Sequence, residues 1–225
     1  MAILMTGLCE KGVELIWKQC NEELYPQGIE YLEEAAHAGD AEGWFFLGNC
    51  YSWGDGAVGF SDKKAYECYK KGIEGGSVRC VLGAARAGQF DEELKKASPC
   101  TLEESYRAVL QSAEEGDAFS AFQIAAAYEW EAIFDLLQPE EQKRENCYKW
   151  YEQAAKGGIV SAMVKVGKCC LNGQYVPKNE EMALKWADRC AALGNAWGLY
   201  RMGLHHLNLG NMEAAWEYFE AAAKQ

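Results

Sequence analysis

The stretch that decides the fold runs from Ala41 to Gly76 and reads AEGWFFLGNCYSWGDGAVGFSDKKAYECYKKGIEGG. Its first part, residues 41–51, carries Ala41, Leu47, Gly48 and Tyr51 at helical spacing, so these residues share one face. A glycine-rich turn follows, and residues 64–73 form a second helical segment. Glycine inside a helix costs about 1 kcal/mol relative to alanine, so Gly48 indicates close packing of another helix. The stretch predicts a helix-turn-helix unit.

Glycines recur along the whole chain behind a short, alanine-rich helix ending. They are Gly39, Gly76, Gly116, Gly158 and Gly194, separated by 37, 40, 42 and 36 residues. Periods of this size are typical of stacked supersecondary units, and a glycine behind a helix supplies the left-handed residue that ends it. We therefore predict one repeat domain over residues 1–225, with approximate units 1–39, 40–76, 77–116, 117–158, 159–194 and 195–225.

The units differ in regularity. The unit that begins at Ile159 repeats the plan closely, and the last unit joins its two helices by a short turn at residues 209–211. The two middle units are looser, because residues 89–100 insert a polar segment and the irregular stretch 130–146 begins with an apolar extension at residues 130–137. The array is expected to depart most from a regular repeat in these two places.

These residues resemble the Sel-one-like repeat (SLR) family, relatives of the tetratricopeptide repeats. The family pattern is close to A-x-x-x-L-G-x-x-Y-x-x-G-x-G-V-x-x-D-x-x-K-A-x-x-W-Y-x-x-A-A-x-x-G, which residues 41–76 and 161–194 match well. Trp150 and Trp186 fall on the structural tryptophan of the pattern, so we expect them in the core. The resemblance implies an all-α, right-handed α/α superhelix (solenoid) of about five to six helix pairs, whose first helices line the concave side.

Composition narrows the class of partner. Apolar residues make up 49% of the chain and aromatic residues 12%, which is enough for a substantial core. The net charge of −12 disfavours nucleic acid and anionic membranes, and it favours a basic protein or peptide. The start of the chain lacks a basic segment, no apolar run approaches 18 residues, and no CxxC pair occurs among the ten cysteines. We expect a cytoplasmic, bacterial protein with reduced thiols and no membrane segment.

Each first helix carries a second stripe of residues, spaced three, four and three positions apart. This stripe cannot point into the helix–helix contact that the packing residues of the same helix face. Aromatic residues on this stripe are candidate partner contacts, because tryptophan and tyrosine dominate interface hot spots. The predicted partner-binding residues are Phe45, Asn49, Trp53, Phe122, Glu129, Trp130, Trp197 and Tyr200. Packing between repeats is the alternative for the aromatic ones, above all for Phe45 and Phe122.

No residue pattern predicts catalysis, a metal or a cofactor. The adjacent His205 and His206 diverge by roughly 100° around a helix and poorly share one metal, and no glycine-rich phosphate loop follows a strand. We therefore predict a non-enzymatic interaction scaffold or adaptor. An immunity or regulatory protein that inhibits one toxin or enzyme is the alternative. A secreted, disulfide-bonded repeat protein is a further alternative. It is disfavoured because the same pair of cysteines would have to recur in each unit, and only Cys68 and Cys80 approach that arrangement.

Overall fold

The computed structural model describes residues 3, 5–19, 21–54, 56, 58–129 and 140–225, and this part of the chain contains helices and turns but no strand. Its α-helices are α1 (Gly7–Val13), α2 (Tyr25–His37), α3 (Ala41–Trp53), α4 (Asp62–Glu74), α5 (Val78–Arg86), α6 (Glu92–Ala97), α7 (Leu102–Glu114), α8 (Ala118–Glu129), α9 (Glu140–Lys156), α10 (Val160–Asn172), α11 (Glu180–Ala192), α12 (Ala196–Asn208) and α13 (Met212–Ala223). A π-helical turn, Glu14–Lys18, follows α1, and a 3-10 turn, Glu22–Leu24, precedes α2. The predicted all-α fold is confirmed.

Local chemistry sets where the helices begin and end. Short polar side chains accept a backbone N–H at the start of α3, α4, α11, α12 and α13, as N-caps do: Asp40, Ser61, Asn179, Asn195 and Asn211. The five recurring glycines of the sequence all have positive φ, between 80° and 106°. They therefore act as the predicted left-handed residues behind the second helices.

Glycines inside the first helices let neighbouring helices approach closely. A Cβ added at Gly48 would lie 2.6 Å from Cε1 of Tyr69 in α4, so the tyrosine ring fills the place of a side chain. A Cβ added at Gly43 would lie 2.7 Å from the backbone nitrogen of Ala36 in α2. The close packing predicted from Gly48 is thus present on both sides of α3.

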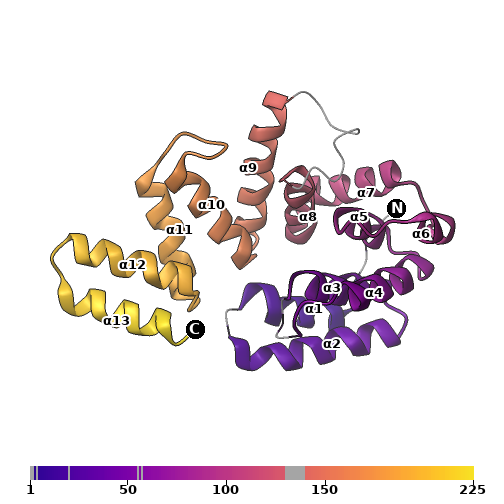
Figure 1. Cartoon of the computed structure of the whole chain (residues 1–225), viewed down its shortest axis with the longest axis horizontal. Helices are drawn as coiled ribbons and strands as arrows, with labels where there is room; N and C mark the ends of the chain where they lie inside the picture. Colours follow the sequence, from indigo (N-terminus) through magenta and orange to yellow (C-terminus); the bar gives the residue numbers. More distant parts are fainter. Residues whose placement is uncertain (1–2, 4, 20, 55, 57, 130–139) are drawn as a thin grey trace.

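The helices form a curved array in which, apart from α6, each helix packs on the next one along the chain, with α1 and α2 at one end and α12 and α13 at the other (Figure 1). A continuous hydrophobic core runs from Cys9 to Cys190. It thins toward the C-terminal end, where α12 buries only three residues (Gly198, Leu199 and Gly203) and α13 buries Ala215. As predicted, Trp150 and Trp186 are buried, at 5% and 4% exposure.

The irregular middle region has its own structure. The polar insertion at residues 89–100 contains α6, which packs on α4 and buries Leu94 completely. Of the second irregular stretch, residues 130–139 lie outside the described part, and α9 begins at Glu140. The insertion therefore adds a helix to the outside of the array without breaking the core.

Candidate partner-binding surface

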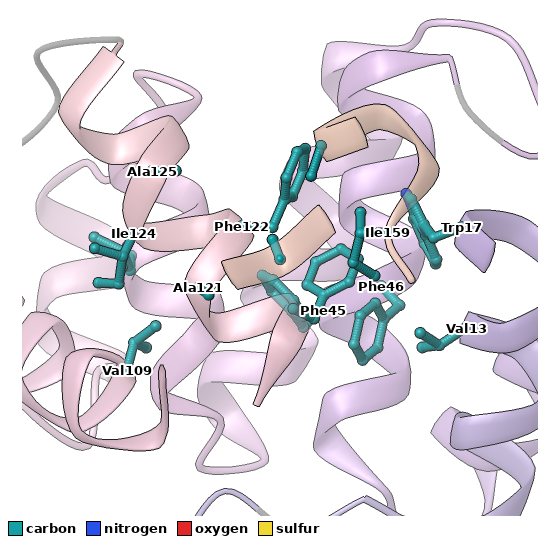
Figure 2. Close-up of a cluster of buried hydrophobic side chains, with 14 of the residues drawn as sticks. Val13, Trp17, Phe45, Phe46, Val109, Ala121, Phe122, Ile124, Ala125 and Ile159 are labelled. Carbon is teal, nitrogen blue, oxygen red and sulfur yellow. The ribbon is translucent and has the colours of Figure 1, made fainter. Parts of the chain in front are cut away.

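An aromatic cluster joins helices that are far apart in sequence. It consists of Trp17, Phe45, Phe46, Phe119 and Phe122, from the N-terminal turn, α3 and α8. The ring centroids of Phe46 and Phe119 are 4.7 Å apart, and Trp17 lies 5.1 Å from Phe119. Figure 2 shows Trp17 and Val13 gathered with Phe45, Phe46, Phe122 and Ile159 in one buried cluster. The array therefore curves tightly enough for α3 to meet α8 across the intervening α5 and α7.

This contact turns part of the predicted stripe into core. Phe45 is fully buried, and Phe122 is 6% exposed. The sequence favours packing for these two residues. It could not show the contact between α3 and α8, because that contact joins residues more than 70 positions apart and depends on the curvature of the whole N-terminal half. Phe45 has no surface to offer to a partner in this structure, and Phe122 has very little.

Trp53 stands at the edge of the cluster. Its ring centroid lies 5.5 Å from that of Phe122, yet the side chain is 39% exposed. The guanidinium of Arg86 sits 4.4 Å from the centroid of the Trp53 ring, in cation–π geometry. Arg86 is held there by Asn49, whose Oδ1 accepts its Nη2–H at 2.8 Å. Asn49 is itself buried, so among these predicted residues Trp53 supplies the exposed surface and Asn49 fixes the arginine beside it.

Two adjoining hollows meet at this pair of side chains. The first, here called the Trp53 hollow, is apolar and is lined by Trp17, Phe45, Asn49, Trp53, Arg86, Phe119, Phe122, Gln123 and Ala126. The second is more open and is lined by Ser52, Trp53, Phe60, Asp62, Arg86 and Ala87. Trp53 and Arg86 line both hollows. Phe60, which is 67% exposed, adds a second exposed ring to this part of the surface.

The other predicted residues do not join this site. Glu129 pairs with Lys165 and accepts the hydroxyl of Tyr151 at 2.6 Å, so its charge is already matched within the fold. Trp130 lies outside the described residues. Trp197 is half-buried and packs on Gly167: a Cβ added at Gly167 would lie 2.3 Å from the Trp197 ring. Tyr200 is 50% exposed on α12, with its ring 5.7 Å from that of Phe219.

Sequence reasoning missed Arg86 and Gln123. Arg86 stands three residues after Gly83, at the place where the unit of residues 41–76 has Tyr51 after Gly48. An arginine at an aromatic position of the repeat is a signal that could have been used. Gln123 carries no such signal, because a glutamine on a helix is usually a solvated residue.

A buried ion network lies near the loops that join the N-terminal units. Arg79 is 1% exposed, and its Nη2 donates to Asp117 at 2.5 Å and to Ser120 at 2.8 Å. Glu42 lies 3.7 Å from Nη1 of the same arginine and accepts the hydroxyl of Ser77 at 2.6 Å. Burial raises the pKa of the Glu42 carboxyl above its ordinary value, although Arg79 and Ser77 act in the opposite direction. Oε2 of Glu42 and Nε of Arg79 make no hydrogen bond to the described residues, and Glu42 and Ser77 also line an open hollow.

In the described part of the chain, the thiols and carboxylates do not form a metal site, and burial makes the thiols unreactive. Nine cysteines lie in the described part of the chain, and eight of them are buried. Burial raises the pKa of Cys68 to about 11 and that of Cys147 to about 12, which disfavours the reactive thiolate. Within the described ranges, no three His, Cys, Asp or Glu side chains group as a metal site. None of the described helices combines the length and apolar character needed to cross a bilayer.

Stacked helix pairs with small residues at their contacts and left-handed glycines behind each second helix define an α-solenoid of short repeats. The family model described as Sel1 repeat matches residues 23–40, 42–77, 137–159, 160–195 and 198–225. These matches cover more than half of the chain, so the chain belongs to the Sel1 repeat family, whose members are generally scaffolds for protein interactions. The unmatched residues 78–136 include α5, α6, α7 and α8, in the middle units that the sequence marks as irregular, whereas α9 lies within a match.

A solved Sel1 repeat structure shares the fold. The chain is similar to the crystal structure of a Sel1 repeat protein from Oxalobacter formigenes, with 19% identity, a TM-score of 0.50, and coverage of 89% of this chain and 82% of that one. It also matches a protective antigen of uropathogenic Escherichia coli that displays an SLR fold, at 20% identity and a TM-score of 0.35, covering 90% and 52% of the two chains. Chitin synthase regulatory factor 4 of Schizosaccharomyces pombe is 37% identical over 76 residues. That alignment spans 33% of this chain and only 12% of the yeast protein.

Proposed function

We propose that this chain is a non-enzymatic, cytoplasmic scaffold that holds a partner protein on the inner face of its helix array. The observation that carries the proposal is the exposed Trp53–Arg86 pair between two hollows. An exposed tryptophan beside an arginine is the composition of an interface hot spot. Tyr200 on α12 offers a second, separate exposed ring, in a part of the array where the core is thin.

The electrostatics support a basic partner. The chain carries a net charge of −12, so its field attracts positively charged proteins and accelerates their approach. Arg86 is held in place by Asn49 and Trp53, so it would contact the partner at one defined position. The long-range attraction of a basic partner comes from the negative charge of the whole protein. Binding to such a partner is expected to slow at high ionic strength, because salt screens exposed charges.

A Trp53→Ala variant tests the proposal. Once a partner has been co-purified from the native host, its affinity is measured by titration against the unaltered chain and against this variant. We expect Trp53→Ala to weaken binding by about tenfold or more, as removal of a hot-spot tryptophan does. Glu67→Ala, at an exposed position of α4, is the matched control and should leave the affinity unchanged. Equal affinity of the two variants would contradict the proposal.

Regulation of one enzyme is a second candidate function. It is favoured by the identity that the repeats share with a protein named Chitin synthase regulatory factor 4. A regulator or immunity protein binds one partner tightly in fixed stoichiometry, whereas an adaptor binds several partners more weakly. The number of co-purified partners and the stoichiometry of each complex separate the two candidates.

A further inference from the structure

One position of the repeat is covered in earlier units and exposed in the last one. Four second helices carry a large aromatic or aliphatic residue five positions after their N-cap residue: Tyr66 in α4, Tyr106 in α7, Leu184 in α11 and Trp216 in α13. Tyr106 is 8% exposed, and Tyr66 and Leu184 are half-buried. Trp216 is 65% exposed, on the helix at the C-terminal end of the array (Figure 1).

In earlier units this position faces the helix that follows. The hydroxyl of Tyr106 lies 3.2 Å from that of Tyr128 in α8. In the same register, also 22 residues apart, the hydroxyl of Tyr148 in α9 lies 3.4 Å from Sγ of Cys170 in α10. Each pair joins the second helix of one unit to the first helix of the next. The register of the repeat therefore places Trp216 where a further helix would pack.

Acidic side chains flank the exposed apolar residues of α13. Met212 is 65% exposed and lies one helical turn before Trp216, on the same side of the helix. Glu213, Glu217 and Glu220 are exposed on the same helix, which carries no lysine or arginine. Nε1 of Trp216 donates to Oε1 of Glu220 at 2.9 Å, so the ring is held beside a carboxylate. These five residues, here called the α13 face, complement a surface that is both apolar and basic.

The same charges disfavour a second copy of this chain as the occupant. Two α13 faces placed together would bring their glutamates against one another. An end-to-end contact would instead bring α13 to α2, which exposes Glu30, Glu33 and Glu34 and has no lysine or arginine. Like charges that face each other across an interface suppress such pairings.

We infer that the α13 face binds a basic amphipathic helix of a partner protein. A helix is the element that packs at this position in the earlier units, and an amphipathic helix presents apolar side chains at positions i and i+4 with basic residues beside them. The apolar side chains would cover Met212 and Trp216, and the basic ones would face the glutamates. The inference goes beyond the proposed function, which rests on α3 and α5, and does not depend on it.

Two peptides test the inference. Each has about 18 residues, which is long enough to form a helix, and each carries leucine along one helix face. One peptide has lysine at the remaining positions and the other has glutamate. Fluorescence anisotropy of the labelled peptides, titrated with the full chain, gives the affinity of each. We expect the lysine peptide to bind, more weakly as salt is added, and the glutamate peptide to show no binding.

Variants of the chain locate the binding site. Trp216→Ala should weaken binding of the lysine peptide by about tenfold, as loss of a hot-spot tryptophan does. Glu217→Lys should weaken it by about threefold, the size expected for exposed charges. Glu67→Lys is the matched control, since it makes the same change of charge at the same position of α4, six residues after the N-cap. It should leave the affinity nearly unchanged.

A further readout needs no variant. A nitroxide attached to the lysine peptide should broaden the NMR signals of α13 more than those of α4. This measurement decides if Trp216→Ala does not fold. Equal broadening of the two helices, or stronger broadening of α4, would overturn the inference.

Other results would also contradict a basic helix on the α13 face. They are equal affinity of the two peptides, binding of neither peptide, unchanged binding in Trp216→Ala, and equal effects of Glu217→Lys and Glu67→Lys. Sedimentation of the free chain tests the second copy: self-association that is lost in Trp216→Ala would assign the face to another copy and overturn the inference. The partner affinity of Trp53→Ala bears only on the proposed function.

Discussion

At the scale of single residues, glycine sets the spacing between helices. Gly43 and Gly198 occupy the third position of α3 and α12, where an added Cβ would meet the backbone of the preceding helix at 2.7 and 2.4 Å. No flexible side chain can move to relieve such a contact. The sequence indicates close packing at Gly48, and the structure shows that the same requirement applies where α2 meets α3.

Replacing Gly43 with alanine tests this role. The added methyl group would force α2 and α3 apart, which costs more than the helix propensity gained, and we expect a net loss of about 1–2 kcal/mol in the free energy of unfolding. Chemical denaturation followed by circular dichroism measures it. Gly7→Ala is the matched control, because a Cβ at this helical glycine would meet nothing within 4 Å. An unchanged stability of Gly43→Ala would show that the helices can yield at this contact.

The buried carboxyl of Glu42 predicts a pH dependence of stability. Its pKa is raised in the folded state by burial, so between its unfolded and folded pKa values the folded protein binds the extra proton. The stability that the protonated group contributes is present below the unfolded pKa and is lost as the pH rises through the folded pKa. Glu42→Gln does not titrate. We therefore expect its stability relative to the unaltered chain to increase as the pH rises from about 4 to about 8.

Denaturation curves of both proteins across this range give the difference directly. Glu104→Gln is a useful contrast, since the pKa of this exposed carboxyl is lowered by the backbone N–H of Thr101. For that variant the difference should change with the opposite sign and at lower pH, because the stability that ionised Glu104 contributes is present above its unfolded pKa and is lost as the pH falls through the lowered folded pKa. A difference between Glu42→Gln and the unaltered chain that is constant with pH would contradict the raised pKa of Glu42.

At the scale of helices, α7 depends on its N-terminal cap. Thr101 accepts the backbone N–H of Glu104, and Glu104 reaches back to the backbone N–H of Thr101, which is a complete capping box. The cap stands directly after the polar insertion that carries α6. It therefore marks where the regular array resumes.

Loss of this cap should be measurable. We expect Thr101→Ala to reduce the free energy of unfolding by about 1 kcal/mol, as removal of an N-cap side chain usually does. Thr101→Ser, which keeps the hydroxyl, should retain most of the stability. Thermal and urea denaturation of the two variants provide the comparison, and equal stability of both would show that the cap contributes nothing to the fold.

The helices themselves could be predicted from the sequence, whereas their longer-range contacts could not. Small residues at helical spacing and positive-φ glycines are local properties, so α3, α4, α10 and α11 follow from their own residues. The meeting of Trp17 with Phe119 depends on how much each helix pair turns relative to the next. Small differences in this rotation add up along the array, and they cannot be predicted from single residues. For this reason the sequence predicts an aromatic stripe and favours packing for Phe45 and Phe122, but it leaves packing and partner contact open for the other aromatic residues.

At the scale of the whole molecule, the two halves of the array differ. In the N-terminal half, α3, α8 and the turn Glu14–Lys18 enclose the aromatic cluster and leave Trp53 at its edge. In the C-terminal half, α12 and α13 bury few residues and expose Tyr200, Leu209, Met212 and Trp216. Apolar and aromatic side chains are thus mostly covered in the N-terminal half and exposed at the C-terminal end.

The central claim is that a partner binds at the Trp53–Arg86 surface, and site-specific crosslinking tests it most directly. The photoreactive residue benzoylphenylalanine is placed at position 53 in one protein and at position 67, exposed on α4, in another. Both are irradiated in the native host, and the crosslinked proteins are identified by mass spectrometry. The account predicts that the same partner is captured from position 53 and not from position 67. Capture of that partner with equal yield from both positions, or only from position 67, would contradict it.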